Sequence, residues 1–145
     1  MEPLDLRKHP PRSCYTEFDG LIVMPRTIDK LRGRLPGGHD GGYFINGRIK
    51  GISGFLLEQL GLTEEQLTEA IAAAPDEESL HAWLRANVDT SLFPKLTHVM
   101  KKLTPEHAED PAFFRDTYAE TIAANPGLSK ILDIVDADDR RIFNP

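Results

Sequence analysis

Three cations recur at every fourth position along one predicted helix, a spacing that can hold an anion. Arg26, Lys30 and Arg34 stand at i, i+4 and i+8, so they share one side of the helix. Guanidinium and ammonium groups gathered in this way bind phosphate or carboxylate groups. Arg12 can reach in from the preceding extended segment, and Asp29 is an acidic partner on the same helix. The candidate ligand-binding residues are therefore Arg12, Arg26, Asp29 and Lys30.

The same cations have a second interpretation, which the sequence leaves open. A row of like charges repels itself unless acidic groups lie nearby, so the row also fits a solvated surface or salt bridges to acidic residues elsewhere in the chain. Ile28, Leu31 and Leu35 fall on the side of helix 26–34 opposite the cations. This pattern predicts that the apolar side of the helix faces the core while its basic side faces solvent.

Charge is distributed unevenly along the 145 residues. Residues 7–50 carry nine Lys/Arg against four Asp/Glu, whereas residues 51–145 carry eight against seventeen, and the formal net charge is −6. A basic front on an acidic protein indicates that a small anion or an acidic protein partner binds there. The net negative charge argues against nucleic-acid binding.

The composition also bears on where the protein works. No apolar run approaches the roughly 20 residues that a membrane-spanning helix requires, and the first residues lack the features of a secretory signal. One cysteine, Cys14, excludes an internal disulfide framework and fits a reducing compartment. We therefore expect a cytoplasmic protein that binds no membrane.

The remaining candidate motifs lack the spacing that their chemistry needs. The glycine-rich loop 37–47 is not followed by the Gly-Lys-Ser/Thr of a phosphate-binding loop. The histidines are scattered, and the aspartates of residues 133–139 lack the order of a calcium loop. Cys14 has a nearby cation that could lower its pKa but no identifiable base. We expect no metal, no cofactor and no assignable catalytic residue.

Apolar residues recur mostly with a helical period. This pattern predicts a mainly α protein, a single orthogonal bundle of about six helices that forms one domain over residues 1–145. Thr63 and Gln66 form a capping-box pattern, and Ser53, Asp76 and Asp110 are the expected N-caps of other helices. After 26–34, the predicted helical segments are 53–60, 64–74, 77 onward, 92–103, 111–124 and 128 onward.

The front of the chain is predicted to be extended. Residues 1–24 are too proline-rich at their start for a helix, so we expect them to pack across the helices as an extended segment, with residues 21–24 forming either a strand or a buried extended stretch. Asn46-Gly47 stands between two apolar stretches, which is the strongest short hairpin signal and predicts a small hairpin near residues 43–50.

The apolar stripes of the helices predict the core. The extended segment should contribute Leu4, Leu6, Tyr15, Phe18, Leu21 and Ile22. The helices should contribute Leu56, Leu57, Leu60, Leu67, Ile71, Leu80, Trp83, Leu84, Leu96, Val99, Met100, Phe114, Tyr118, Ile122, Ile131, Leu132 and Val135.

Several stretches of the chain resemble one family. They are residues 6–13, residues 24–32 with their Pro-Arg-x-x-Asp-Lys element, residues 55–62, the helix of Leu80 and Trp83, and residues 136–143. Together they make the chain similar, over most of its length, to the uncharacterised bacterial proteins grouped as domain-of-unknown-function family 5069. The resemblance implies a bacterial cytoplasmic setting, and it implies no activity, cofactor or site residues.

Two functions from different classes fit these observations. The leading hypothesis is a non-enzymatic binding or interaction module whose basic N-terminal face meets an acidic protein or a small anion. The alternative is an enzyme that acts on a phosphorylated or carboxylated small molecule held by Arg12, Arg26 and Lys30. A pocket that joins Arg26 and Lys30 to Asp29, His39 or Tyr43 favours the enzyme, and a flat basic face favours the protein partner. A third hypothesis is self-association as a homodimer.

Overall fold

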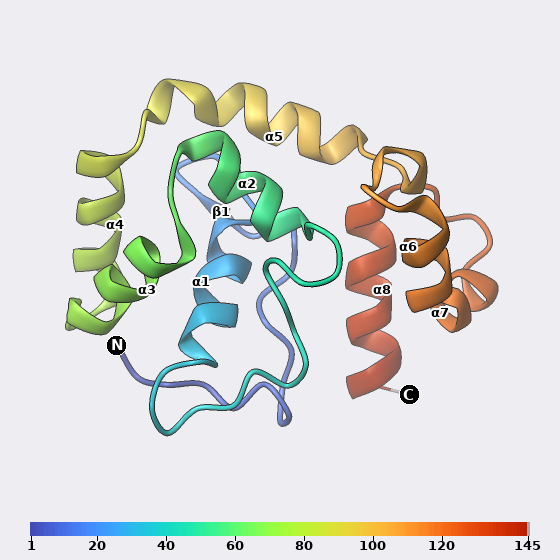
Figure 1. The fold of residues 1–145 in the computed structure, drawn as a ribbon, viewed down its shortest axis with the longest axis horizontal. Helices are drawn as coiled ribbons and strands as arrows, with labels where there is room; N and C mark the ends of the chain where they lie inside the picture. Colours follow the sequence, from blue (N-terminus) through green and yellow to red (C-terminus); the bar gives the residue numbers. More distant parts are fainter. Residues whose placement is uncertain (145) are drawn as a thin grey trace.

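The computed structural model describes residues 1–144, and over these residues the fold is mainly helical, as predicted (Figure 1). A short antiparallel hairpin, β1 (Glu17–Phe18) and β2 (Leu21–Ile22), precedes the helices. Within the described residues, no helix has the length and apolar composition needed to cross a bilayer. The α-helices are α1 (Met24–Arg32), α2 (Ile52–Leu60), α3 (Glu64–Ala73), α4 (Glu77–Asn87), α5 (Phe93–Lys102), α6 (Pro111–Thr117), α7 (Ala119–Ala124) and α8 (Ile131–Phe143), with 3-10 turns η1 (Thr90–Leu92) and η2 (Pro105–His107).

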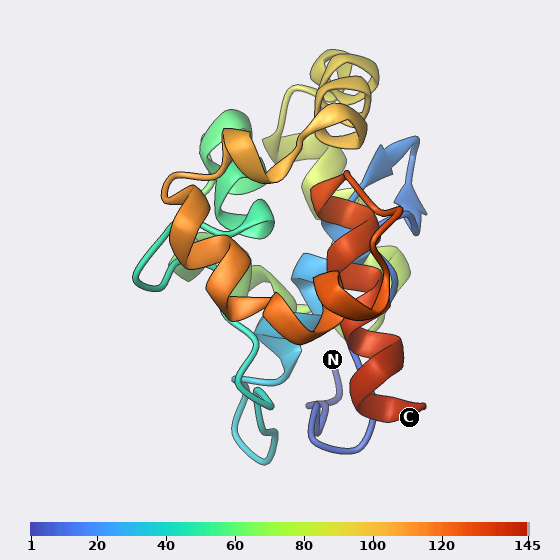
Figure 2. The same ribbon diagram turned by 90° about the vertical axis from the view of Figure 1, so that its right-hand side faces the viewer.

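Helix α1 occupies the middle of the molecule (Figures 1 and 2). It packs against α2, α3 and β1. Helix α5 crosses one end of the molecule, contacts α2, β2 and α8, and connects the α3–α4 side to the α6–α8 side. Because other elements surround α1, all its residues from Met24 to Leu31 are buried, the charged ones included.

A strained residue sets the direction of α1. Val23 has a φ of 71°, in the left-handed region, which is unfavourable for a β-branched side chain. Its N–H donates to the Cys14 carbonyl at 2.9 Å, and its side chain is fully buried. These contacts hold the turn from β2 into α1, and Pro25 then stands in the first helical turn, where its missing N–H costs nothing.

Local helix signals in the sequence are confirmed. Thr63 and Gln66 form the reciprocal capping box at the start of α3. The side chains of Asp76 and Asp110 cap α4 and α6. Gly61 ends α2 with a φ of 70°, a conformation that glycine adopts without strain.

The predicted core is also confirmed, apart from Val99 on α5 and Leu4 in the extended segment, which is only partly buried. Every helical position expected in the core belongs to the buried apolar cluster or packs against it, except Val99, which is partly exposed. From the extended segment, Leu6, Phe18, Leu21 and Ile22 are buried. The apolar stripes therefore identified which side of each helix faces inward.

The hairpin lies at residues 17–22 rather than near 43–50. The latter segment is reduced to a single antiparallel bridge between Asn46 and Lys50. Two cations that follow the expected turn form ion pairs with other parts of the chain. Arg48 pairs with Asp110 before α6, and Lys50 pairs with Glu58 on α2. These contacts hold the second arm against other parts of the chain, and the two arms share only this bridge and the hydrogen bond from the Gly51 N–H to the Ile45 carbonyl among the described residues, although Asn46-Gly47 favours a tight turn.

Two helix boundaries also differ from the prediction. The segment 111–124 forms α6 and α7 rather than one helix, because Tyr118, with φ −106° and ψ 20°, leaves the helical conformation. The last helix begins at Ile131 rather than at 128, since the Ile131 N–H donates to the Leu103 carbonyl at 2.9 Å.

Gly54 on α2 provides a test of how tightly this helix packs. A Cβ at Gly54 would lie 2.7 Å from the Ile45 carbonyl oxygen and 2.3 Å from Asn46 Oδ1, so Gly54→Ala must displace backbone. We expect a loss of roughly 1–3 kcal/mol in the free energy of unfolding, measured by denaturant titration. Gly127→Ala is the matched control, since its Cβ meets no atom within 4 Å. Equal stability of the two variants would contradict the close approach.

Candidate functional site

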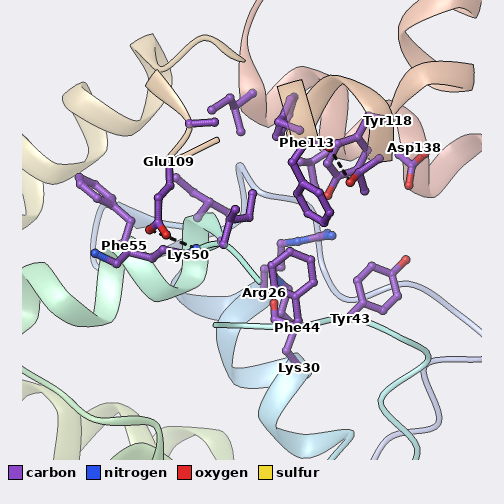
Figure 3. Close-up of a pocket in the computed structure, with 18 of the residues that line it drawn as sticks. Arg26, Lys30, Tyr43, Phe44, Lys50, Phe55, Glu109, Phe113, Tyr118 and Asp138 are labelled. Carbon is purple, nitrogen blue, oxygen red and sulfur yellow. Dashed lines mark hydrogen bonds between the residues drawn. The ribbon is translucent and has the colours of Figure 1, made fainter. Parts of the chain in front are cut away.

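A cavity of about 420 Å³ opens between α1, residues 41–52 (segment 41–52), α2, α6 and α8 (Figure 3). Arg26 and Lys30 enter it from α1, and Tyr43 enters it from segment 41–52. A largely apolar cavity with a few polar groups is the usual form of a small-molecule site. The apolar walls include Phe44, Ile49, Phe55, Phe113, Ile131 and Val135.

Arg26 brings a permanent positive charge to the buried side of the cavity. Arg26 is 1% exposed, and its Nη1 donates to Asp139 Oδ2 at 2.6 Å and to the Arg12 carbonyl at 3.2 Å. The Tyr43 hydroxyl donates to Asp139 Oδ1 at 2.7 Å. Burial and this hydrogen bond raise the pKa of Tyr43 well above its usual value. Asp139 therefore joins α8 to both α1 and segment 41–52, and Tyr43 stays protonated at neutral pH.

Lys30 is a buried cation with no acidic partner among the described residues. Its Nζ donates to the Phe44 carbonyl at 3.1 Å and to Ser53 Oγ at 3.2 Å, and the residue is 6% exposed. Burial, together with the neighbouring charge of Arg26, lowers the pKa of Lys30 from 10.5 to about 7. The charged and neutral forms of this amine therefore coexist near neutral pH.

The side chains of Arg12 and Asp29 pair with each other and do not line the cavity. Arg12 Nε and Nη2 each donate to an Asp29 oxygen at 3.0 Å, and Nη2 lies 2.7 Å from Glu77 Oε1. Helix α1 thus directs Asp29 toward the N-terminal segment. Of the four predicted site residues, the structure brings two, Arg26 and Lys30, into the cavity.

The prediction that the basic side of helix 26–34 faces solvent is wrong for Arg26 and Lys30, which are buried, whereas Arg34, beyond the end of α1, is exposed. A helical period identifies which residues share one side of a helix, but it does not identify what covers that side. Here other parts of the fold cover Arg26 and Lys30. Acidic residues from the second part of the chain pair with three of the cations, as in the salt-bridge interpretation, and the pairs are Arg26–Asp139, Arg12–Glu77 and Arg34–Glu64.

The thiol of Cys14 is not activated. Burial raises the pKa of Cys14 to about 12, and this effect outweighs the opposing influence of the nearby Arg26 charge. The residue is fully buried. A thiol in this state is a poor nucleophile at neutral pH.

Two residues that contact the cavity cations escaped prediction. Asp139 follows Val135 by four positions, so it lies on the apolar side of α8. A carboxylate at such a position could have been predicted to be buried. Ser53 was expected as an N-cap, but Gly51 holds that position and the Ser53 hydroxyl is fully buried against α1. Its role depends on a helix distant in sequence, so no local pattern indicates it.

The lowered pKa of Lys30 predicts an unusual pH dependence of stability. In the unfolded chain a lysine with a pKa near 10.5 keeps its proton between pH 7 and 10, whereas folded Lys30 releases it. The unfolded state then binds more protons, so raising the pH stabilises the wild type by about 1.4 kcal/mol per pH unit relative to Lys30→Met. Denaturant titrations from pH 7 to 10 measure this slope, with Lys101→Met on α5 as the control for loss of an exposed lysine. A constant difference between wild type and Lys30→Met would contradict it.

The Arg26–Asp139 pair predicts a large effect of removing one charge. Asp139→Asn keeps the shape of the side chain but leaves the buried guanidinium without a counterion, which costs about 3–5 kcal/mol of unfolding free energy. Asp19→Asn is the matched control, because Asp19 pairs with Arg85 where both side chains are more than a third exposed, and we expect a loss of less than about 1 kcal/mol there. Similar losses of unfolding free energy in the two variants would show that burial does not increase the cost of removing the counterion.

Residues 8–141 match the family model described as "Domain of unknown function (DUF5069)", which confirms the resemblance seen in the sequence. No curated protein matches the chain. Because the match covers nearly all of its 145 residues, the chain belongs to the DUF5069 family.

Proposed function

We propose that the chain binds a small organic carboxylate with an apolar body, and that the cavity beside α1 holds this ligand. The observation that carries the proposal is the position of Lys30, a cation without a carboxylate partner, next to Arg26 and among apolar walls. The cavity also joins both cations to Tyr43, the arrangement expected of a small-molecule pocket rather than of a flat basic face for an acidic protein.

The charges around the cavity favour a ligand with one negative charge. Beside α1, Asp139 balances Arg26 and Arg141 pairs with Asp138 at 3.2 Å, so protonated Lys30 is the positive charge without a carboxylate partner at that end of the cavity. Lys50 and Glu109 also line the cavity, and their charges are opposite in sign. A carboxylate neutralises the charge of Lys30. A phosphate monoester carries about −1.5 to −2 at pH 7, and its excess charge would repel the nearby aspartates where the surroundings screen poorly.

The hydrogen bonds of Lys30 leave a place for one ligand oxygen. A protonated lysine has three N–H donors, and the Phe44 carbonyl and Ser53 Oγ accept two of them. The third has no acceptor among the described residues. A carboxylate oxygen supplies that acceptor and the counterion together, and charge-assisted bonds of this kind are the stronger ones.

The walls fit an aromatic or branched aliphatic body. The cavity volume of about 420 Å³ lies within the range of roughly 300–1,000 Å³ typical of small-molecule sites. Burying apolar ligand surface against Phe44, Phe55 and Phe113 contributes about 25 cal/mol per Å². A suitable probe is 4-phenylbutanoate, which combines one carboxylate, a flexible chain and one ring.

We expect 4-phenylbutanoate to bind at pH 7 at least about tenfold more tightly than the uncharged 4-phenylbutanamide, a difference of about 1.4 kcal/mol. Binding of the anion favours the protonated form of Lys30, whose pKa in the free protein is about 7. The affinity should therefore be nearly constant from pH 6 to 7 and fall as the pH rises further, by up to about tenfold per pH unit. Isothermal titration calorimetry at several pH values measures both effects.

Two variants serve as the controls for this experiment. Lys30→Met should bind the carboxylate and the amide with similar affinity and lose the pH dependence above pH 7. Lys101→Met, which removes an exposed lysine that does not line the cavity, should bind as the wild type does. Equal binding of carboxylate and amide by the wild type, or no binding of either, would refute the proposal.

A further inference from the structure

We propose that Lys30 is a catalytic nucleophile, and that its Nζ condenses with the carbonyl carbon of an apolar aldehyde or oxo acid in the cavity to form an imine. This inference rests on the proposed function, because it uses the same cavity and the same amine. It goes further by naming the substrate class, carbonyl compounds, and by assigning a covalent step to the site.

The hydrogen bonds of Lys30 suit the neutral amine as well as the charged one. A neutral amine has two N–H groups, and the Phe44 carbonyl at 3.1 Å and Ser53 Oγ at 3.2 Å can accept both. The lone pair on Nζ is then left without a protein partner among the described residues. Since Lys30 lines the cavity, a carbonyl carbon bound there has a nucleophile that the protein holds in place.

The surroundings of Lys30 favour the neutral form of its amine. Burial and the charge of Arg26 lower the pKa of Lys30 to about 7. The other groups that act on it are Arg34 just after α1, Asp139 on α8 and Cys14 in the N-terminal segment, and Asp139 is already paired with Arg26. Lysines desolvated in this way serve as imine-forming nucleophiles in enzymes.

The condensation balances without any further reactant. The Nζ lone pair forms the C–N bond while the π electrons of the C=O bond move to oxygen. Nitrogen then loses two protons, the oxygen receives both, and water leaves as the C=N bond forms. The Ser53 hydroxyl lies 3.2 Å from Nζ and accepts a hydrogen bond from Thr27 Oγ1 at 2.8 Å, so it is placed to relay a proton between nitrogen and oxygen.

Arg26 favours an oxo acid among the carbonyl compounds. It stands one helical turn before Lys30 on the same side of α1, and both residues line the cavity. Nη1 and Nη2 of Arg26 are taken by Asp139 and the Arg12 carbonyl, but Nε has no hydrogen-bond acceptor among the described residues. A carboxylate next to the carbonyl can therefore accept a hydrogen bond from Nε while the carbonyl meets the amine. The matching probe is 4-phenyl-2-oxobutanoate, which has the carbon skeleton of 4-phenylbutanoate with a carbonyl added.

The test is reductive trapping of the full chain. The protein is incubated at pH 7 with 4-phenyl-2-oxobutanoate and sodium cyanoborohydride, which converts an imine to a stable secondary amine, and adducts are located by intact-mass and peptide mass spectrometry. We expect one adduct per chain, on Lys30, formed at least roughly tenfold faster than on the exposed Lys101, because a lysine with a pKa near 7 has far more free amine at this pH than an ordinary lysine. Excess 4-phenylbutanoate should slow the reaction, and Lys30→Met should form no fast adduct.

The outcomes separate this inference from the proposed function. Binding of 4-phenylbutanoate without a fast Lys30 adduct would overturn the imine inference and leave the carboxylate site intact. A fast Lys30 adduct that 4-phenylbutanoate neither slows nor competes with would support the nucleophile and refute the carboxylate site. Labelling of Lys30 and Lys101 at similar rates would overturn the imine inference even if adducts form.

Discussion

The carboxylate of Asp139 accepts hydrogen bonds from Arg26 on α1 and from Tyr43 in segment 41–52, although Asp139 follows Arg26 by 113 residues. A guanidinium that is 1% exposed is strongly destabilising without a counterion. Helix α1 can therefore sit in the middle of the molecule only when α8 has docked against it. This contact ties α8 to α1 and to segment 41–52, and hydrogen bonds from Cys14 and Tyr15 to Asp136 and Asp133 add further links between α8 and the N-terminal segment.

The same contact explains why the two cavity cations differ. Arg26 and Lys30 stand one helical turn apart in similar burial, yet Asp139 pairs with Arg26 and no described carboxylate pairs with Lys30. Burial without a counterion therefore affects Lys30, which can become neutral by releasing its proton. Arginine remains charged under any physiological condition, so this division of roles follows from the chemistry of the two side chains.

The parts of the fold that local sequence controls were predictable. The capping box of Thr63 and Gln66, the αL glycine at position 61 and the apolar stripes of the helices each act over a few residues, and each was found as expected. Long-range contacts were not predictable in this way. Around Asn46-Gly47 the hairpin is reduced to one bridge, and Arg48 and Lys50 pair there with the distant Asp110 and Glu58.

The site residues likewise fall into those that local sequence predicted and those that long-range contacts determine. The i, i+4 spacing correctly placed Arg26 and Lys30 together, and Tyr43 was among the groups expected beside them. The partners that determine their chemistry, Asp139 and Ser53, lie on helices that reach α1 only through the tertiary fold. The sequence identified both cations, but only the tertiary structure shows that Arg26 has a carboxylate partner and Lys30 has none among the described residues.

The hydrogen bond from Lys30 Nζ to the Phe44 carbonyl joins α1 to segment 41–52, which forms one wall of the cavity. Under the proposed chemistry this bond would depend on the number of hydrogens on Nζ. A neutral imine nitrogen has no hydrogen to donate, so imine formation would remove this link between α1 and the cavity wall.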